Sequence, residues 1–175
     1  MSCSTLENVL KGCGNNQGGV VSAYLFDMDD IATITESTST WNVTALTLLG
    51  HSPALALEFK LNTASYTDDE KIDLGPNGST YWEKSVNFIF NRREAAKSKS
   101  IKILGEGQRY VGIVIGDANG LFWLFKNLQL SAVTGGSGKV NADGSNYDVT
   151  LVGQGEFSAL EVSSGIAASL LIATS

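Results

Sequence analysis

The chain has 175 residues, a length that fits a single domain able to bury a core of its own. Its 18 Asp and Glu residues outnumber its 12 Lys and Arg residues, and the net charge of −6 argues against a protein that holds duplex DNA through clustered cations. The chain has no run of about 20 apolar residues, so we expect no membrane-spanning segment.

The first third of the chain predicts an irregular arm followed by short strands. Residues 1–18 are glycine-rich, and we expect an irregular N-terminal arm there. Val20 to Met28 is rich in branched and aromatic residues, which is typical of a strand, and Ile31 to Thr35 alternates. Trp41 to Leu49 and Ala54 to Asn62 place apolar residues at every second position, which predicts two half-buried strands.

The middle of the chain predicts a protrusion, a strand and a helix. Thr63 to Ser79 is polar and acidic, contains a Gly-Pro-Asn-Gly turn signal and is too long for an ordinary hairpin loop. We therefore expect a protruding β-hairpin or a functional loop there, followed by a strand from Tyr81 to Phe90. Asn91 to Leu104 predicts the one helix, with Asn91 as its cap, Glu94 completing a capping box and Gly105 ending it.

The last third of the chain returns to strands. Arg109 to Ile115 and Leu121 to Phe125 flank a Gly-Asp-Ala-Asn-Gly sequence, which is a hairpin signal. The Leu-Phe-Trp-Leu-Phe run is apolar on both faces, so it needs cover on both sides. We expect the core to cover one side and a neighbouring subunit the other. Further strands are expected at Leu128 to Val133 and Tyr147 to Val152, on either side of a glycine loop at 135–138.

These elements predict one mainly β domain over residues 1–175. We expect an antiparallel β-sandwich or barrel of about ten strands, with a flanking helix at about 91–104 and the protruding hairpin or loop at about 63–79. Residues 163–175 are predicted to form a C-terminal strand or extension, because Ala167 to Thr174 is apolar but short.

Residues with catalytic or metal-binding chemistry are scarce. His51 is the only histidine, and nothing near it suggests a Ser/His/Asp or Cys/His set, so we expect no enzyme. One His and two Cys make a structural zinc site improbable, and we expect no cofactor. We expect Cys3 and Cys13 to be free thiols. The alternative is a disulfide between them that closes a small loop.

Two other segments resemble ligand sites only in part. Val133 to Val140 lacks the first Gly and the final Ser or Thr of a phosphate loop, so we interpret it as a flexible hairpin loop. Asp27, Asp29 and Asp30 offer oxygen ligands to a hard cation, but their spacing matches no EF-hand, and an acidic, solvated turn is the simpler interpretation.

Several segments in a fixed order carry a resemblance to a known family. They are the Cys-containing start, Gly18 to Val21 with Ala23 to Phe26, Asp29 to Ile31 with Ile34 and Thr35, Ala64 to Thr67, Tyr81 to Val86, Tyr110 to Val114 before Asp117 to Leu124, and Gly138 to Leu151. In these segments the chain resembles tail-tube and related virion proteins of tailed bacteriophages, particularly those of Bacteroidetes hosts. It departs from them in the polar insertion at 63–79 and after Val162.

The resemblance implies a structural role in the virion. Members of this family assemble as stacked, commonly sixfold rings around a channel through which the genome leaves the particle. It implies that the partners are copies of this chain and other tail proteins, such as the sheath or tape measure, the terminator and the baseplate. DNA would pass without sequence-specific binding, and the protein would reside in the virion tail after assembly in the bacterial host cytoplasm.

Two groups of residues are the expected subunit contacts, and three alternatives stay open. The contacts are Asp68, Asp69 and Glu70 in the acidic segment, together with Phe122, Trp123 and Phe125. The first alternative is another virion component, such as a neck, tail-terminator or capsid-decoration protein. The second is a carbohydrate-binding β-sandwich, which would expose Trp41, Trp82 or Trp123 on a concave face. The third, a small hydrolase, would have to use His51.

Overall fold

The chain is described here by a computed structural model that covers residues 16–37, 39–50, 52–60, 62–72, 76, 78–139 and 144–171. Of these residues, 54 % lie in strands and 16 % in helices, which confirms the mainly β fold with one main helix. The sheet does not close into a barrel.

The described elements follow one another as strands with short helical insertions. In chain order they are β1 (Val20–Asp27), a 3-10 turn (Met28–Asp30), β2 (Ile31–Ser37), β3 (Asn42–Leu48), β4 (Leu55–Ala56), β5 (Ser65–Ile72), β6 (Thr80–Asn91), α1 (Ala95–Gly105), a second 3-10 turn (Glu106–Gln108), β7 (Val111–Asp117), β8 (Phe122–Gly136), β9 (Asn146–Gly155), β10 (Leu160–Val162) and α2 (Ser164–Ser169).

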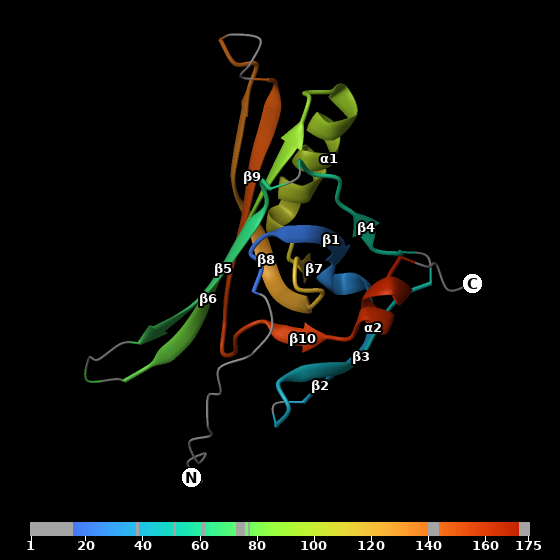
Figure 1. Cartoon of the computed structure of the whole chain (residues 1–175), viewed down its shortest axis with the longest axis vertical. Helices are drawn as coiled ribbons and strands as arrows, with labels where there is room; N and C mark the ends of the chain where they lie inside the picture. Colours follow the sequence, from blue (N-terminus) through green and yellow to red (C-terminus); the bar gives the residue numbers. More distant parts are fainter. Residues whose placement is uncertain are drawn as a thin grey trace.

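The strands form one continuous sheet that folds over at β8 (Figure 1). Sheet A has the order β2-β3-β10-β8-β7-β1-β4, and sheet B has the order β5-β6-β9-β8. Strand β8 belongs to both, because its first half pairs with β7 and its second half, from Gln129 to Gly136, pairs with β9. All pairs are antiparallel except β3 with β10, so the sheet is mixed.

Asn127 marks the bend at which β8 passes from one sheet to the other. Its φ of 57° lies in the left-handed region, which asparagine tolerates better than most residues. Gly153 of β9 lies against this bend, where an added Cβ atom would come within 2.6 Å of the Asn127 carbonyl oxygen. A glycine is therefore required where the two strands approach this closely.

Sheet A has a hydrophobic core on each face. The first core lies between the two sheets and contains Ile113 and Phe125 of sheet A and Phe88 of sheet B. The second lies on the opposite face of sheet A, where Val114 and Leu124 pack with residues of β3, β10 and α2. This double cover explains why β7 is buried at six consecutive positions, Val111 to Gly116.

Several expected boundaries are wrong. The strand predicted for Ala54 to Asn62 is reduced to the two residues of β4, although Leu57 and Phe59 do pack against the first core. The strands predicted at 121–125 and 128–133 are one strand, β8. This strand stays continuous because its pairing passes from β7 to β9 along a single backbone.

The helix starts four residues later than predicted. Asn91 still pairs with Asn146 as the last residue of β6, and Arg92 then turns the chain at a φ of 60°. The N-cap is Glu94, which makes no side-chain capping hydrogen bond, so the predicted capping box is wrong. Gly105 lies inside the helix as its last residue rather than after it.

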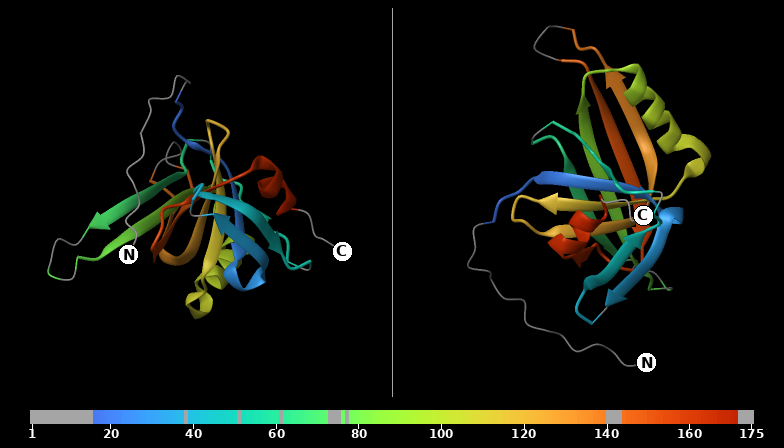
Figure 2. Two further views of the ribbon diagram at one scale, coloured as in Figure 1. Left: turned by 90° about the horizontal axis from the view of Figure 1, so that it is seen from below. Right: turned by 90° about the vertical axis from the view of Figure 1, so that its right-hand side faces the viewer.

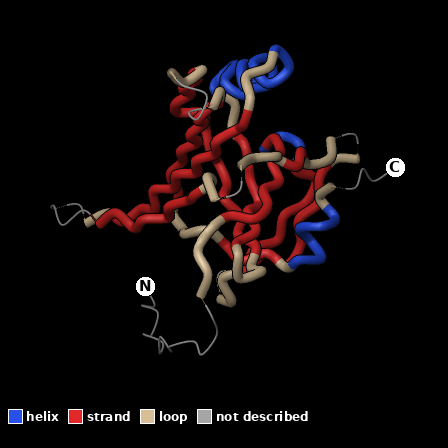
Figure 3. Tube along the Cα trace, turned by 45° about the horizontal axis from the view of Figure 1, so that its top comes forward, coloured by secondary structure: helices blue, strands red, loops and turns tan. Residues whose placement is uncertain are grey.

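The C-terminal strand prediction is also wrong for the described residues. Ser163 caps α2 by accepting a hydrogen bond from the Ile166 backbone N–H over 3.4 Å, and Ala167 and Leu170 pack into the second core. Residues 172–175 lie outside the described part of the chain. Figure 3 shows the two α-helices well apart, in agreement with the packing of α1 near β8 and of α2 on β3.

The protruding hairpin is confirmed. Strand β5 pairs with β6 from Ser65 opposite Asn87 to Ile72 opposite Thr80, and β6 pairs with β9 only as far as Trp82. The end of the hairpin therefore extends past β9, as Figure 1 shows. Most of the predicted Gly-Pro-Asn-Gly turn lies outside the described residues.

Candidate functional site: an open-edged sheet with a polar face

The expected contacts on β5 divide into two exposed residues and one internal anchor. Asp69 and Glu70 are exposed, as a contact requires. Asp68 faces inward, where its Oδ2 accepts a hydrogen bond from the Ala159 backbone N–H over 2.6 Å. Its Oδ1 is buried and has no hydrogen-bond partner within the described structure. Asp68 therefore fastens β5 to the segment between β9 and β10.

The expected contacts on β8 are largely covered by the chain itself. Phe125 is fully buried in the first core and cannot touch a neighbouring subunit, so that expectation is wrong. Leu124 is buried in the second core, so the predicted cover by a neighbour is wrong at this position too. Phe122 and Trp123 are half-buried, and the Trp123 indole donates to Asp117 Oδ2 over 3.2 Å.

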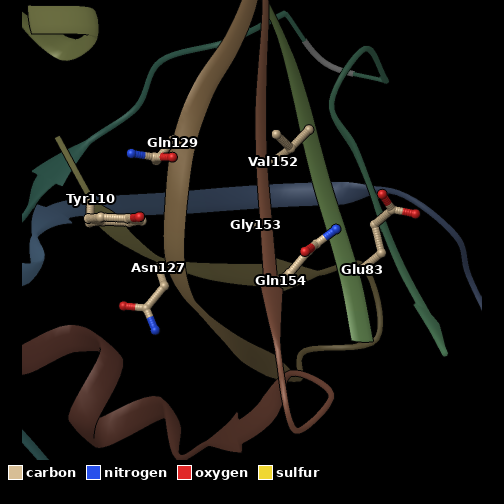
Figure 4. A pocket seen from close by; sticks show the side chains of 7 residues that line it. All are labelled: Glu83, Tyr110, Asn127, Gln129, Val152, Gly153 and Gln154. Carbon is tan, nitrogen blue, oxygen red and sulfur yellow. The ribbon is translucent and has the colours of Figure 1, made fainter. Parts of the chain in front are cut away.

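A polar hollow of about 490 Å³ lies on the outer face of sheet B. Figure 4 shows its lining residues, which come from β6, β8, β9 and the segment before β7: Glu83, Tyr110, Asn127, Gln129, Val152, Gly153 and Gln154. Their amides, hydroxyl and carboxylate suit hydrogen bonds to a polar surface. The lining contains one carboxylate and no His, Cys, Ser or Lys, so it offers no acid–base pair and no activated nucleophile.

The rest of this face is also polar. Asn87 Nδ2 donates to Asp148 Oδ1 over 2.5 Å and to Thr150 Oγ1 over 3.0 Å, linking β6 to β9. Lys71 lies 3.4 Å from Glu83 in an exposed ion pair of small energetic value. The outer face of sheet B therefore presents hydrogen-bonding groups of both signs rather than a basic patch.

Sheet B has two open edges. In the described part of the chain β5 pairs only with β6, and β8 from Ser131 to Gly136 pairs only with β9 and is exposed throughout. The register puts Ser65 of β5 level with Ala132 of β8, through Asn87 and Thr150. Beyond that level, β8 continues toward the end of the sheet at Asn91, whereas β5 continues toward the opposite end at Thr80. The two open edges are therefore displaced from each other along the strand direction.

The inner face of sheet B carries charges at the join with sheet A. Lys84 is 5 % exposed and lies opposite Asp68 in the β5–β6 register. Burial lowers the pKa of Lys84, while nearby Asp68 favours its charged form. Burial likewise raises the pKa of Asp68, against the effects of the Ala159 N–H and of Lys84. Lys126 and Glu36 form an ion pair beside them.

Sequence analysis missed Lys84, although a signal was present. Between Tyr81 and Phe90 it shares its side of the strand with Trp82, Val86 and Phe88, and a lysine in an apolar stripe indicates a buried charge. Also missed were Tyr110, Asn127, Gln129 and Gln154. Polar residues on the exposed face of a strand carry no signal that separates a hollow from ordinary solvated surface.

The remaining candidates are three residues outside the described structure and one acidic turn within it. His51, Cys3 and Cys13 lie outside the described residues. Asp27 Oδ1 accepts the Asp29 backbone N–H over 3.1 Å, and its Oδ2 lies 3.1 Å from Arg109 Nη1. Within the described ranges no three His, Cys, Asp or Glu side chains group closely enough to hold a metal ion.

The three tryptophans do not form one platform. Trp41 is 41 % exposed, donates its indole N–H to Ser158 Oγ over 2.7 Å and meets Phe157 edge-on. Trp123 packs against the first core, and among the described residues no ring contact joins any two of the three. The three tryptophans therefore offer no shared aromatic surface to a ligand.

Comparisons with protein-family models, curated proteins and solved structures give no match to this chain. No helix in the described ranges combines the length and the apolar character needed to cross a membrane.

Proposed function

We propose that the chain is a structural virion protein of a tailed phage, whose copies join edge to edge into rings that stack as the tail tube. The pair of open edges on sheet B carries this proposal. Exposed, unpaired strand edges invite pairing with another chain, and closure into a ring is one way to remove them. The resemblance to tail-tube proteins supplies the expectation of six copies per ring.

The strand directions support closure between identical copies. Sheet B contains four strands that alternate in direction, so β5 and β8 at its two edges run antiparallel to each other. When β5 of one copy lies beside β8 of the next, the alternation continues across the join. This contact is heterologous, which generates a ring when the rotation closes.

The offset between the two edges also supports a barrel-like ring. Strands in a closed barrel tilt relative to its axis, and the pairing register must then be staggered around the circumference. The displacement of β5 from the free part of β8 along the strand direction is a stagger of this kind. The polar outer face of sheet B would line the channel. Because it lacks a basic cluster, it would not hold DNA phosphates in place.

Cysteine cross-linking tests the edge contact directly. We would place Cys at exposed positions on both edges, Thr67→Cys on β5 and Thr134→Cys on β8, in a Cys3→Ser, Cys13→Ser background. A short bis-maleimide should then give a ladder of oligomers that ends at the ring size, because the two edges meet only between copies. Electron microscopy of the same sample should show rings or tubes.

The single-cysteine variants are the matched controls. A heterologous contact never brings Thr67 of one copy against Thr67 of another, so each single variant should stay uncross-linked. Dimers from a single variant would indicate a twofold contact and contradict ring closure. A strictly monomeric protein at high concentration would contradict the proposal as a whole.

A second candidate function is carbohydrate binding, which the polar hollow favours. Tyr110 is 54 % exposed beside Gln129, Asn127 and Gln154, and an aromatic ring flanked by amides suits a sugar. A glycan array distinguishes the two functions. Binding that is lost in Tyr110→Ala would support a carbohydrate module, whereas an array without hits would remove it.

A further inference from the structure

A second cavity of about 590 Å³ lies between α1, β1, β4 and the inner face of sheet B. Most of its lining is apolar, including Leu57, Phe90, Ile101 and Leu104. Leu55 at its margin is 64 % exposed, so the cavity opens to solvent. An open, mostly apolar pocket of this size is typical of a site that binds a ligand or a partner segment.

Helix α1 covers this cavity without filling it. None of its residues is buried, and Ile103 is 40 % exposed. At both ends the chain turns through left-handed residues, Arg92 with a φ of 60° and Gln108 with a φ of 51°. The described chain therefore covers the apolar surface beneath α1 only in part.

The chain itself contains a segment of suitable chemistry. Its first 15 residues, which the structure does not describe, include Leu6, Val9 and Leu10. Apolar side chains at this spacing are typical of anchors that enter a hydrophobic groove.

The position at which this segment joins the described chain favours binding to the cavity of a neighbouring copy rather than to its own. Asn119 in the β7–β8 turn accepts the Gln17 backbone N–H over 2.8 Å and donates to Asn16 Oδ1 over 3.3 Å. Strand β1 then runs about 17 Å from Val20 to the cavity wall at Leu25. The right-hand view of Figure 2 shows β1 starting on the β5 side of the molecule and α1 lying on the β8 side.

We propose that residues 1–15 of one copy occupy the cavity beneath α1 of the adjacent copy. The inference rests on the proposed ring, in which the β5 side of one copy faces the β8 side of the next. Each arm then crosses the join in the same direction as the strand pairing. It adds an apolar contact to a join that otherwise consists of backbone hydrogen bonds.

The native cysteines in the arm allow a test on the full-length chain. We would introduce Ser100→Cys, an exposed position on α1 that lines the cavity, and assemble a mixture of light and isotopically heavy protein. After treatment with a bis-maleimide, mass spectrometry should find the thiol introduced on α1 linked to Cys3 or Cys13 in mixed-isotope pairs. Ser164→Cys at the exposed start of α2, which does not line the cavity, is the control and should give no such link.

The outcomes separate this inference from the proposed function. Rings that form with links only inside one copy, or with no links to the thiol introduced on α1, would overturn the arm exchange and leave the ring intact. Absence of rings in the same micrographs would overturn both. A second variant, Leu6→Asp with Leu10→Asp, should lose the cross-link while its circular dichroism spectrum matches that of the parent. Retention of the link would overturn the role of the apolar anchors.

Discussion

Gly153 is the residue at which the bend of β8 depends on a missing side chain. An added methyl group would meet the Asn127 carbonyl oxygen at 2.6 Å and the Leu128 side chain at 2.9 Å. We expect Gly153→Ala to lower the free energy of unfolding by about 1–3 kcal/mol, a typical cost of overpacking. Urea denaturation measures this difference.

Gly165 on α2 is the matched control, because nothing lies within 4 Å of an added Cβ there. Alanine in this helix should leave stability unchanged or raise it by about 0.5 kcal/mol. Equal losses at the two positions would show that close approach to β8 is not the cause.

Asp68 gives the protein a pH dependence of defined sign. Burial raises its pKa in the folded state above the value of about 3.9 expected in the unfolded chain. The associated stability is present below about pH 3.9 and is lost as the pH rises through the folded pKa. Asp68→Asn keeps a side-chain oxygen that can accept the Ala159 N–H but removes the titration. Relative to the parent, the variant should therefore gain stability as the pH rises through this window.

Denaturation at a series of pH values measures the difference between variant and parent. Asp69→Asn, an exposed change on the same strand, controls for net charge. The same trend in both variants would contradict the assignment to burial at position 68.

At the scale of elements, α1 should be less protected than the central strands of the first core. It contributes no buried residue, whereas β6, β7 and β9 each place buried residues in the first core. Local opening should therefore cost far less in α1 than in these strands. Hydrogen exchange followed by mass spectrometry should show the amides of Ala95–Gly105 exchanging before those of β6, β7 and β9. Protection of α1 equal to that of β6 in the monomer would contradict this expectation.

The elements also show what the alternation of apolar residues can predict. It located β3, β6 and β9, whereas β1 was located by its branched and aromatic residues and buries side chains in both cores. It failed between Ala54 and Asn62 because alternation reports burial rather than backbone pairing. Leu57 and Phe59 do face the first core, but only Leu55 and Ala56 pair with β1.

The predicted cover of residues 121–125 by a neighbouring copy and the predicted C-terminal strand are wrong for related reasons. The run at 121–125 was correctly expected to need cover on both faces, and α2 provides part of the second cover. Residues 163–175 are predicted as a strand or extension, so the sequence analysis does not anticipate the cover that α2 provides. A short apolar run does not distinguish strand from helix, but Ser163 ahead of it was a capping signal.

At the scale of the whole molecule, the open edges could not be predicted from sequence. Which strand lies at an edge depends on the order β5-β6-β9-β8, and β6 pairs with β9 although α1, β7 and β8 lie between them in the chain. Local sequence patterns predict where strands occur. Long-range pairing decides which strands have a neighbour on one side only and so lie at an edge. The polar hollow was missed for the same reason, since its residues come from four segments.

Net charge makes a prediction about assembly. Each copy carries −6, so copies brought together repel one another, while pairing between strand edges is insensitive to salt. Added salt shortens the range of the repulsion, to about 8 Å at 0.15 M. The assembled fraction should therefore rise with sodium chloride in sedimentation velocity experiments. Dissociation by salt would instead indicate an interface held by ion pairs.

The continuity of β8 has a mechanical consequence, because one strand belongs to both sheets and links them covalently. One end of it, at Gly136, lies on the free edge, and the other anchors Leu124 against the C-terminal helix. A force applied at the free edge of sheet B is therefore transmitted along the backbone of β8, through the bend at Asn127, into sheet A. Neither half can be deformed without straining the other.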